Sequence, residues 1–205
     1  MGSRNYWSSW MLCVVIFLVF IVQNIFPGLT DGLALDSRFV SEPWLLITSM
    51  FIHGSSLHLL GNLFALGLFG ILLEQEIGTR RFLIIYFVAG IIAGLIGSFF
   101  YPSLIGASGS IFGAMGTLAV MKPKMTVWTY GVPMPMVVAA AFWLLLDIGG
   151  VFYPTNVANI AHIAGLAFGV LVGLLIRKPE PKKPKRTRLL DDGDFNRWED
   201  RWFGI

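Results

Sequence analysis

The chain has 205 residues, of which 56% are hydrophobic and only 13% are charged. A soluble domain carries about 25% charged residues, so this composition excludes an ordinary soluble protein and indicates a membrane protein. The net charge is +3, and it is unevenly spread, because the run 177–188 holds seven basic residues and one acid. The position of this run directly after the last apolar stretch favours a membrane flank over a nucleic-acid site.

Six apolar stretches predict an all-α membrane protein in which residues 1–176 form one six-helix bundle. The expected spans are about 10–26, 57–73, 82–101, 108–121, 132–148 and 157–176. A spanning helix needs roughly 17–25 residues, so the fourth stretch predicts a short helix that starts inside the membrane. No small-residue cleavage site follows the first stretch, which favours an uncleaved span over a signal peptide. The long loop 27–56 is expected to be a structured element at the membrane interface.

The basic residues predict the orientation of the bundle. With both termini in the cytoplasm, 14 of the 15 lysines and arginines lie on the inner side, and only Arg38 lies outside. The positive-inside rule therefore predicts cytoplasmic termini. The compact six-span form suggests a bacterial or archaeal plasma membrane, with an organelle membrane as the alternative.

Residues 177–205 are predicted to form a separate, basic cytoplasmic tail. Three prolines prevent a helix in its first part, and its basic run favours anionic lipid. Aromatic residues then recur at helical spacing, at Phe195, Trp198, Trp202 and Phe203. A short amphipathic helix on the membrane surface and a disordered tail are the two readings.

Polar side chains inside apolar spans are costly, so each one needs a reason. At about 1.5 Å per helical residue, Ser108 and His162 lie about 21 and 22 Å from the inner boundary. His58 and Asn62 lie about 24 and 18 Å from it by the same measure. The four residues therefore share one layer near the outer surface. A short fourth helix leaves free N–H groups at this depth, so the layer is expected to border a water-filled cavity open to the outside.

Ser108 is predicted to be a nucleophile with His162 as its general base. Gly106 and Gly109 flank the serine where a loop enters a helix, and a helix N-terminus offers amide donors to a developing oxyanion. Taken alone, this tetrapeptide is more typical of a serine that caps a helix. The histidine at equal depth changes the balance toward catalysis, although a lone buried histidine is more often structural.

Two rows of small residues predict that the fourth and sixth spans pack closely. One row is Gly109, Gly113 and, one position off the repeat, Gly116; the other is Ala161, Gly165, Gly169 and Gly173. Small residues at intervals of four let helix backbones approach, as a serine–histidine hydrogen bond requires. Phe112 either stacks on the imidazole or is an ordinary packing residue. Asp147 and Glu74 are not expected to reach His162, so the site is predicted to be a dyad.

His58 and Asn62 lie one helical turn apart on one face. Together with the backbone amide of Ser108, they are predicted to form an oxyanion hole. Polar packing between helices is the alternative for this pair.

Together these residues resemble the rhomboid family of intramembrane serine proteases. The resemblance covers roughly residues 44–176 and rests on the His58/Asn62 pair, the GASG motif at 106–109 and the segment AHIAGLAFG at 161–169. It implies a six-helix bundle that cleaves transmembrane protein substrates near the outer face, with lateral substrate access beside the fifth segment around Phe142 and Trp143.

The chain departs from the family pattern at two positions. The segment Glu42-Pro43-Trp44 resembles the start of a family motif that usually continues with arginine, where Leu45 stands here. Members of the family often have tyrosine at the position of Phe112. The departure at Leu45 is expected to affect the anchoring of the loop and not the chemistry.

Other membrane functions fit the sequence less well. A zinc protease needs a His-Glu-x-x-His helix and an aspartyl protease needs two membrane aspartates, and neither pattern occurs. No cofactor, metal or nucleic acid is expected, and the oligomeric state stays open. A membrane-protein binder or chaperone that keeps the fold without cleaving is the main alternative. A small transporter would predict internal repeats or paired charges in the spans, and the sequence shows neither.

Overall fold

The computed structural model describes residues 7–26, 28–129, 131–153, 157–177 and 201, and the predicted tail lies almost entirely outside this set. The described chain is mostly helical. Its long helices are α1 (Ser8–Ile25), α4 (Ser56–Ala65), α5 (Ile71–Ile77), α6 (Thr79–Gly97), α7 (Ser108–Met121), α8 (Met136–Phe152) and α9 (Asn159–Ile176). A π-helical turn, η3 (Leu66–Gly70), joins α4 to α5.

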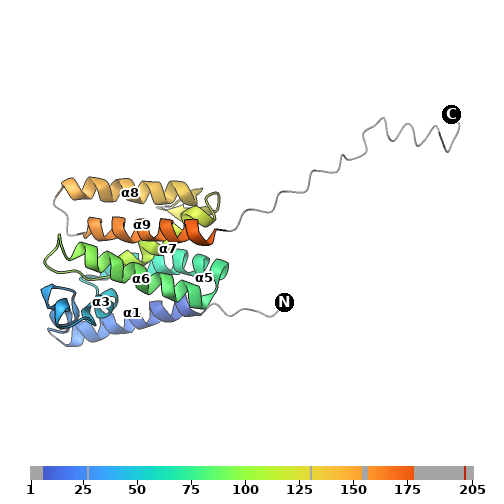
Figure 1. The fold of residues 1–205 in the computed structure, drawn as a ribbon. Coiled ribbons are helices and arrows are strands. Elements are labelled where there is room, and N and C mark those ends of the chain that lie inside the picture. The colour runs from blue at the N-terminus through green and yellow to red at the C-terminus, as the bar shows by residue number, and fades with distance from the viewer. Residues whose placement is uncertain (1–6, 27, 130, 154–156, 178–200, 202–205) are drawn as a thin grey trace.

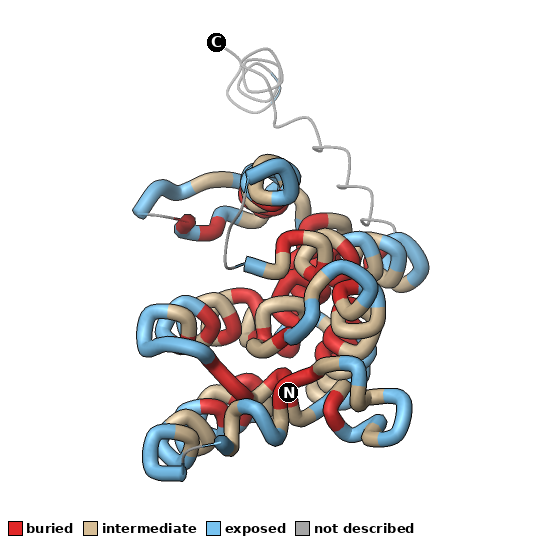
Figure 2. Tube along the Cα trace, turned by 90° about the vertical axis from the view of Figure 1, so that its left-hand side faces the viewer, coloured by how far each residue is buried: buried red, intermediate tan, exposed pale blue. Residues whose placement is uncertain are grey.

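The helices form a layered bundle in which α9 lies between α8 and α6 (Figure 1). The start of α1 and the end of α9 lie at the same end of the bundle. Buried residues line the inner faces of the helices, and exposed ones cover the outside (Figure 2). Many exposed side chains of α1 and α8 are large and apolar, as expected of helices that face lipid.

Four segments are long and apolar enough to cross a membrane: Ser8–Ile25, Ser56–Ile77, Thr79–Gly97 and Asn159–Ile176. The helices α7 and α8 are apolar but shorter. The structure therefore agrees with a helical membrane bundle, and the count of six spans stays a prediction.

The short helix α7 is the centre of the bundle. Every residue from Ser110 to Ala119 is buried. Its closest neighbours are α9 and α6. Glycines make the contact with α9 close, because a Cβ atom at Gly165 would overlap the carbonyl oxygen of Gly109, and one at Gly169 would overlap that of Gly113. The two rows of small residues thus face each other, backbone against backbone.

One part of the sequence prediction is wrong. Residues 132–135 were expected to begin the fifth span, but Val132–Pro135 is a strand, β2, that pairs antiparallel with β1 (Thr126–Thr129). Pro133 and Pro135 lack the N–H groups that a helix needs, and Gly131 turns the hairpin at a φ of +76°. The helix α8 begins only at Met136, directly after the second proline.

The long loop between α1 and α4 is folded, and it holds short helices: α2 (Leu29–Leu33), η1 (Ser37–Val40), α3 (Leu45–Thr48) and η2 (Ser49–Phe51). An antiparallel bridge joins it to the loop after α6, since the backbones of Leu35 and Leu104 exchange two hydrogen bonds of 3.0 and 2.8 Å. Leu45, at the position of the expected arginine, is fully buried in an apolar cluster with Leu35 and Leu104.

Candidate active site

Ser108 is the first residue of α7 and follows a strained turn. Gly106 has a φ of +113°, which favours glycine, and its N–H donates to the carbonyl of Ser49 at 2.8 Å. Ala107, not Ser108, is the N-cap residue of the helix. The reading of Ser108 as a helix cap is therefore wrong, and its hydroxyl is available for other contacts.

The hydroxyl of Ser108 lies 2.7 Å from Nε2 of His162. His162 is in the first turn of α9, and both Ser108 and His162 are only partly accessible to solvent. The backbone around it is tied to the loop after α6, because the N–H of Ile160 donates to the hydroxyl of Tyr101 at 3.2 Å. Two helix starts that are remote in sequence thus place a hydroxyl against an imidazole.

Asp147 corrects the prediction that no acid reaches His162. Its Oδ1 lies 2.9 Å from Nδ1 of His162, and the side chains are only 6% and 12% exposed, respectively. The chain enters α8 from the end at which α7 finishes and enters α9 from the opposite end (Figure 1). A residue late in α8 therefore lies level with a residue early in α9.

The imidazole of His162 is also held on its face. The ring of Phe112 stacks on it with a centroid distance of 4.4 Å and an interplanar angle of 13°. Trp143 of α8 packs edge-on against Phe112 at 6.1 Å. The stacking that was one of two readings of Phe112 is present in the structure.

His58 faces the turn that precedes Ser108. A Cβ atom at Gly106 would lie 2.8 Å from Cε1 and Nε2 of His58, and 3.9 Å from the hydroxyl oxygen of Ser108. The N–H of Gly54 donates to Nδ1 of His58 at 3.4 Å, so a neutral ring carries its proton on Nε2, toward the serine. Ser55 caps α4 by accepting from the N–H of His58 at 3.1 Å.

Asn62 lies below His58 on the same helix and is buried. Its Nδ2 donates to the backbone carbonyl of His58 at 2.9 Å. Among the described residues, its Oδ1 has no hydrogen-bond partner. In this structure one amide N–H is thus engaged within α4, and the side chain also interacts with that of His53.

His53 supports this pair, although the sequence singled it out for no role in the site. Its ring lies 5.0 Å from that of His58, and its backbone N–H and carbonyl both bond to the side chain of Gln23 of α1, at 3.1 and 3.2 Å. Burial, and to a lesser degree the neighbouring His58, lower the pKa of His53 to about 4. His53 is therefore neutral at pH 7.

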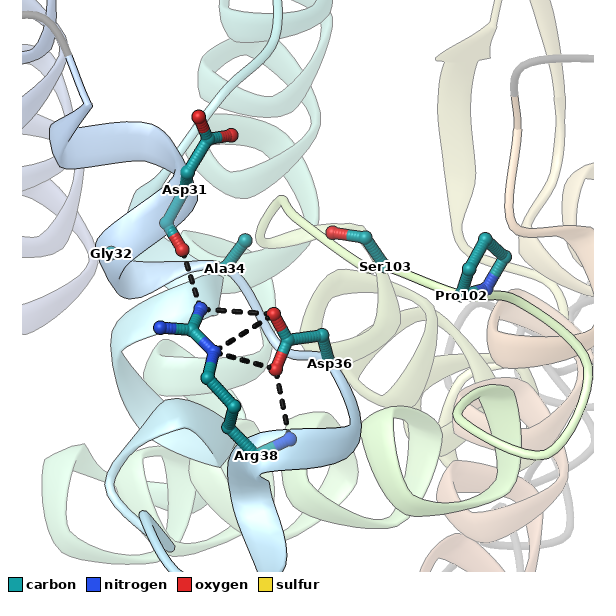
Figure 3. Close-up of a pocket in the computed structure, with 7 residues that line it drawn as sticks. All are labelled: Asp31, Gly32, Ala34, Asp36, Arg38, Pro102 and Ser103. Carbon is teal, nitrogen blue, oxygen red and sulfur yellow. Dashed lines mark hydrogen bonds and ion pairs between the residues drawn. The ribbon is translucent and has the colours of Figure 1, made fainter.

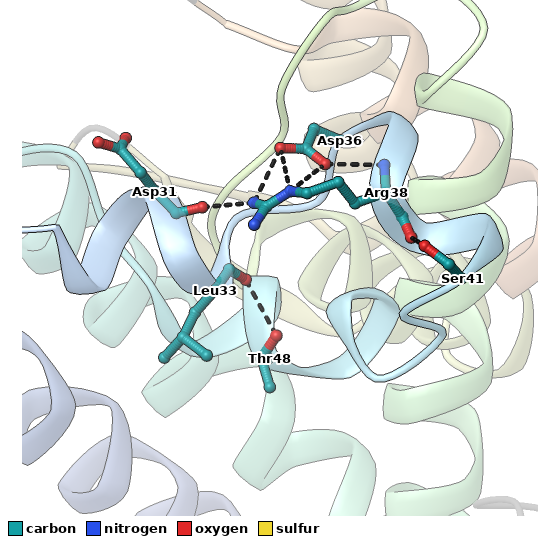
Figure 4. Close-up of polar contacts among 6 residues, drawn as sticks. All are labelled: Asp31, Leu33, Asp36, Arg38, Ser41 and Thr48. Atoms are coloured by element: carbon teal, nitrogen blue, oxygen red, sulfur yellow. Dashed lines mark hydrogen bonds and ion pairs between the residues drawn. The ribbon is translucent and has the colours of Figure 1, made fainter.

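The loop beside the site has its own polar network (Figure 4). The guanidinium of Arg38 forms an ion pair of 2.9 Å with Asp36 and also bonds to the carbonyl of Asp31. The Thr48 hydroxyl donates to the carbonyl of Leu33 at 2.9 Å. Hydrogen bonds from Arg38 lower the pKa of the Asp36 carboxyl.

A depression of about 490 Å³ lies between this loop and residues Pro102 and Ser103 (Figure 3). Its charged residues are Asp31, Asp36 and Arg38, and the arginine is already paired within the loop. None of the residues predicted to react lines it.

A family model described as the rhomboid domain matches residues 40–179, which is more than half of the chain. The chain belongs to the rhomboid family. This family membership, with the apolar helices, makes the protein an integral membrane protein.

Three relatives show the range of the similarity. The chain is 34% identical to RHOMBOID-like protein 6, mitochondrial, of Arabidopsis thaliana over 72% of its own length and 49% of that protein. It is 36% identical to rhomboid protease GluP of Bacillus subtilis over 68% of its length and 27% of that protein. It is 27% identical to rhomboid protease GlpG of Haemophilus influenzae over 67% of its length and 72% of that protein.

The chain thus spans half or less of the length of several rhomboid relatives, including RHOMBOID-like protein 6 and GluP. The relatives come from plants and bacteria, and one is named mitochondrial. The comparisons therefore do not favour the predicted prokaryotic plasma membrane over an organelle membrane.

Proposed function

We propose that this rhomboid protein is an intramembrane serine endopeptidase. The observation that carries the proposal is the 2.7 Å contact between the Ser108 hydroxyl and Nε2 of His162, at the N-terminus of a central, short helix. A serine hydroxyl needs an adjacent base to become a nucleophile. The names of GluP and GlpG, which call both relatives rhomboid proteases, support the same reaction class.

The reaction is acyl transfer. Nε2 of His162 accepts the hydroxyl proton while Oγ of Ser108 attacks the carbonyl carbon of the scissile peptide bond. The imidazolium then returns the proton to the leaving amine nitrogen, and an acyl-enzyme ester remains. Water, deprotonated by the same imidazole, hydrolyses the ester and restores the serine. No metal or cofactor takes part in these steps.

The negative oxygen of the intermediate is stabilised by three donors. The N–H of Ser108 is at a helix start, where backbone donors lack partners within the helix. The Nε2–H of His58, which lies against Gly106, and an amide N–H of Asn62, one turn further along α4, are the proposed side-chain donors. Gly106 lets the turn before Ser108 pack against the ring of His58, and Gly109 lets α7 pack against Ala93 of α6.

The substrates are transmembrane segments of other proteins. The side chains of Phe142 and Trp143 on α8 lie next to the site, and Phe142 is 38% exposed. We place substrate access beside α8 on this basis. With both termini in the cytoplasm, the site opens toward the outer side.

Cleavage of a test substrate with one transmembrane segment checks the proposal. We expect Ser108→Ala and His162→Ala each to lower kcat by at least about a thousandfold. Labelling by a fluorophosphonate is expected at Ser108 and at no other serine. The matched control is Ser110→Ala, which removes a buried hydroxyl from the same helix; this hydroxyl donates to the sulfur of Met50, at 3.6 Å, and has no contact with His162 among those described.

Full cleavage by Ser108→Ala would refute the mechanism. A protein that binds the substrate, resists fluorophosphonate labelling and never cleaves would instead be the membrane-protein binder or chaperone considered from the sequence.

A further inference from the structure

A buried acid lies on the helix that borders the proposed substrate path. Asp147 is the one charged residue of α8, and it is 5% exposed. A carboxyl group in an apolar helix is rare and usually has a partner and a function. Here the partner is Nδ1 of His162, at 2.9 Å.

We propose that Asp147 is a positioning residue that holds His162 in the tautomer and orientation needed for catalysis. The inference rests on the proposed function and extends it from a dyad to a chain of three side chains. Asp147 touches neither substrate nor the reacting atoms, and it acts through the imidazole.

The hydrogen-bond chemistry of the two side chains fixes the tautomer. A carboxylate only accepts hydrogen bonds, so the contact with Asp147 requires a proton on Nδ1 of His162. A neutral imidazole with Nδ1–H has a free lone pair on Nε2. That lone pair faces the Ser108 hydroxyl at 2.7 Å and accepts its proton. The carboxylate then stabilises the imidazolium that forms.

The packing of α8 against α9 and α7 holds Asp147 next to His162. Gly150, three residues after Asp147, lies against Asn159, three residues before His162: a Cβ atom at Gly150 would be 2.6 Å from the Asn159 amide atoms. One turn before Asp147, Trp143 packs on Phe112, which stacks on His162. One face of α8 thus carries both Asp147, which contacts the edge of the imidazole, and Trp143, which supports the Phe112 ring that stacks on the imidazole.

The first experiment reads the tautomer directly. The chain has three histidines, so the nitrogen resonances of histidine-labelled protein in detergent can be assigned with single variants at His53 and His58. We expect neutral wild-type His162 to carry its proton on Nδ1, and Asp147→Leu to move it wholly or partly to Nε2. Wild-type His162 protonated on Nε2 would overturn the proposal, whatever the behaviour of the Asp147 variant.

The second experiment compares kcat with KM. We expect Asp147→Asn and Asp147→Leu to lower kcat by at least about tenfold with KM within about twofold, because the proposed binding surface is unchanged. Asp147→Glu, which keeps the carboxylate, is expected to restore part of kcat.

Glu76→Gln is the matched control, because it removes a carboxylate that pairs with Lys122 at 2.9 Å at the opposite end of the bundle. An unchanged kcat in folded Asp147→Leu would overturn the proposal. The role of Asp147 is tested by the histidine spectrum, which needs no substrate. The proposed function is tested by cleavage, and it fails if Ser108→Ala still cleaves. Failure of one proposal can therefore be told from failure of the other.

Discussion

Single residues set the geometry of the site, and Gly106 shows how. Its backbone conformation is one that other residues rarely adopt, and the space where its Cβ would stand is filled by the ring of His58. The glycine thus lets the turn before Ser108 approach His58, the proposed oxyanion donor. The sequence motif identified the glycine, but the histidine it contacts comes from a segment about fifty residues earlier.

Gly106→Ala is expected to damage the site more than the fold. The strained φ and the overlap with His58 at 2.8 Å should lower stability by about 1–3 kcal/mol and the fluorophosphonate labelling rate by at least about tenfold. Gly61→Ala is the control, because a Cβ there meets nothing within 4 Å. Wild-type labelling of Gly106→Ala would show that the close approach is dispensable.

The lowered pKa of His53 predicts that the free energy of unfolding falls in acid. Its pKa is about 4 in the folded protein against 6.5 as the ordinary value. The unfolded chain therefore takes up a proton first as the pH falls below 6.5, and stability that is complete above this pH declines toward pH 4. At pH 5 the loss is about 2 kcal/mol. Thermal unfolding of wild type and His53→Asn at pH 7 and pH 5 measures it; an equal loss in both proteins would contradict the assignment to His53.

Pairs of helices decide whether the reactive residues meet. The contact between α7 and α9 brings the backbones of Gly113 and Gly169 together, and the serine–histidine distance depends on it. This contact could be predicted, because small residues recur every four positions in both segments. The approach of Asp147 to His162 could not be predicted, because a fifth span that starts at residue 132 would place Asp147 near its outer end. With α8 starting at Met136, Asp147 lies about 17 Å along the helix, near the depth of Ser108.

Gly169→Ala should separate α7 from α9. The added Cβ overlaps a backbone oxygen, which cannot turn away as a side chain can, so we expect a loss of about 1–3 kcal/mol or more. Labelling of Ser108 should fall together with the unfolding temperature. Gly149→Ala, on α8 and in open space, is the comparison. A stable, fully labelled Gly169→Ala protein would be inconsistent with the close contact.

At the scale of the whole molecule, the helical class and the layer of polar residues could be predicted from hydrophobicity and residue spacing alone. The folded loop between α1 and α4 could not be derived in detail, because its contacts are backbone hydrogen bonds such as those between Leu35 and Leu104. Such bonds leave no pattern in the side chains. The hairpin at 126–135 was missed for a related reason, since Val132 and Met134 extend the apolar run of α8.

The orientation of the molecule can be tested with single cysteines in a Cys13→Ser background. Ser103 and Lys124 are exposed at opposite ends of the bundle, since one lies in the loop that leads into α7 and the other follows its last turn. We expect an impermeant thiol reagent added to intact cells to label Ser103→Cys and to reach Lys124→Cys only after lysis. The reverse pattern would place the termini outside.

The scaffold of the proposed site extends beyond the stretch that the family model matches. That stretch begins at residue 40, yet Gln23 of α1 holds the backbone of His53, and Leu35 pairs with Leu104 in the segment that leads to Ser108. A fragment cut at residue 40 would contain every residue proposed to react, and would lack the scaffolding that aligns them.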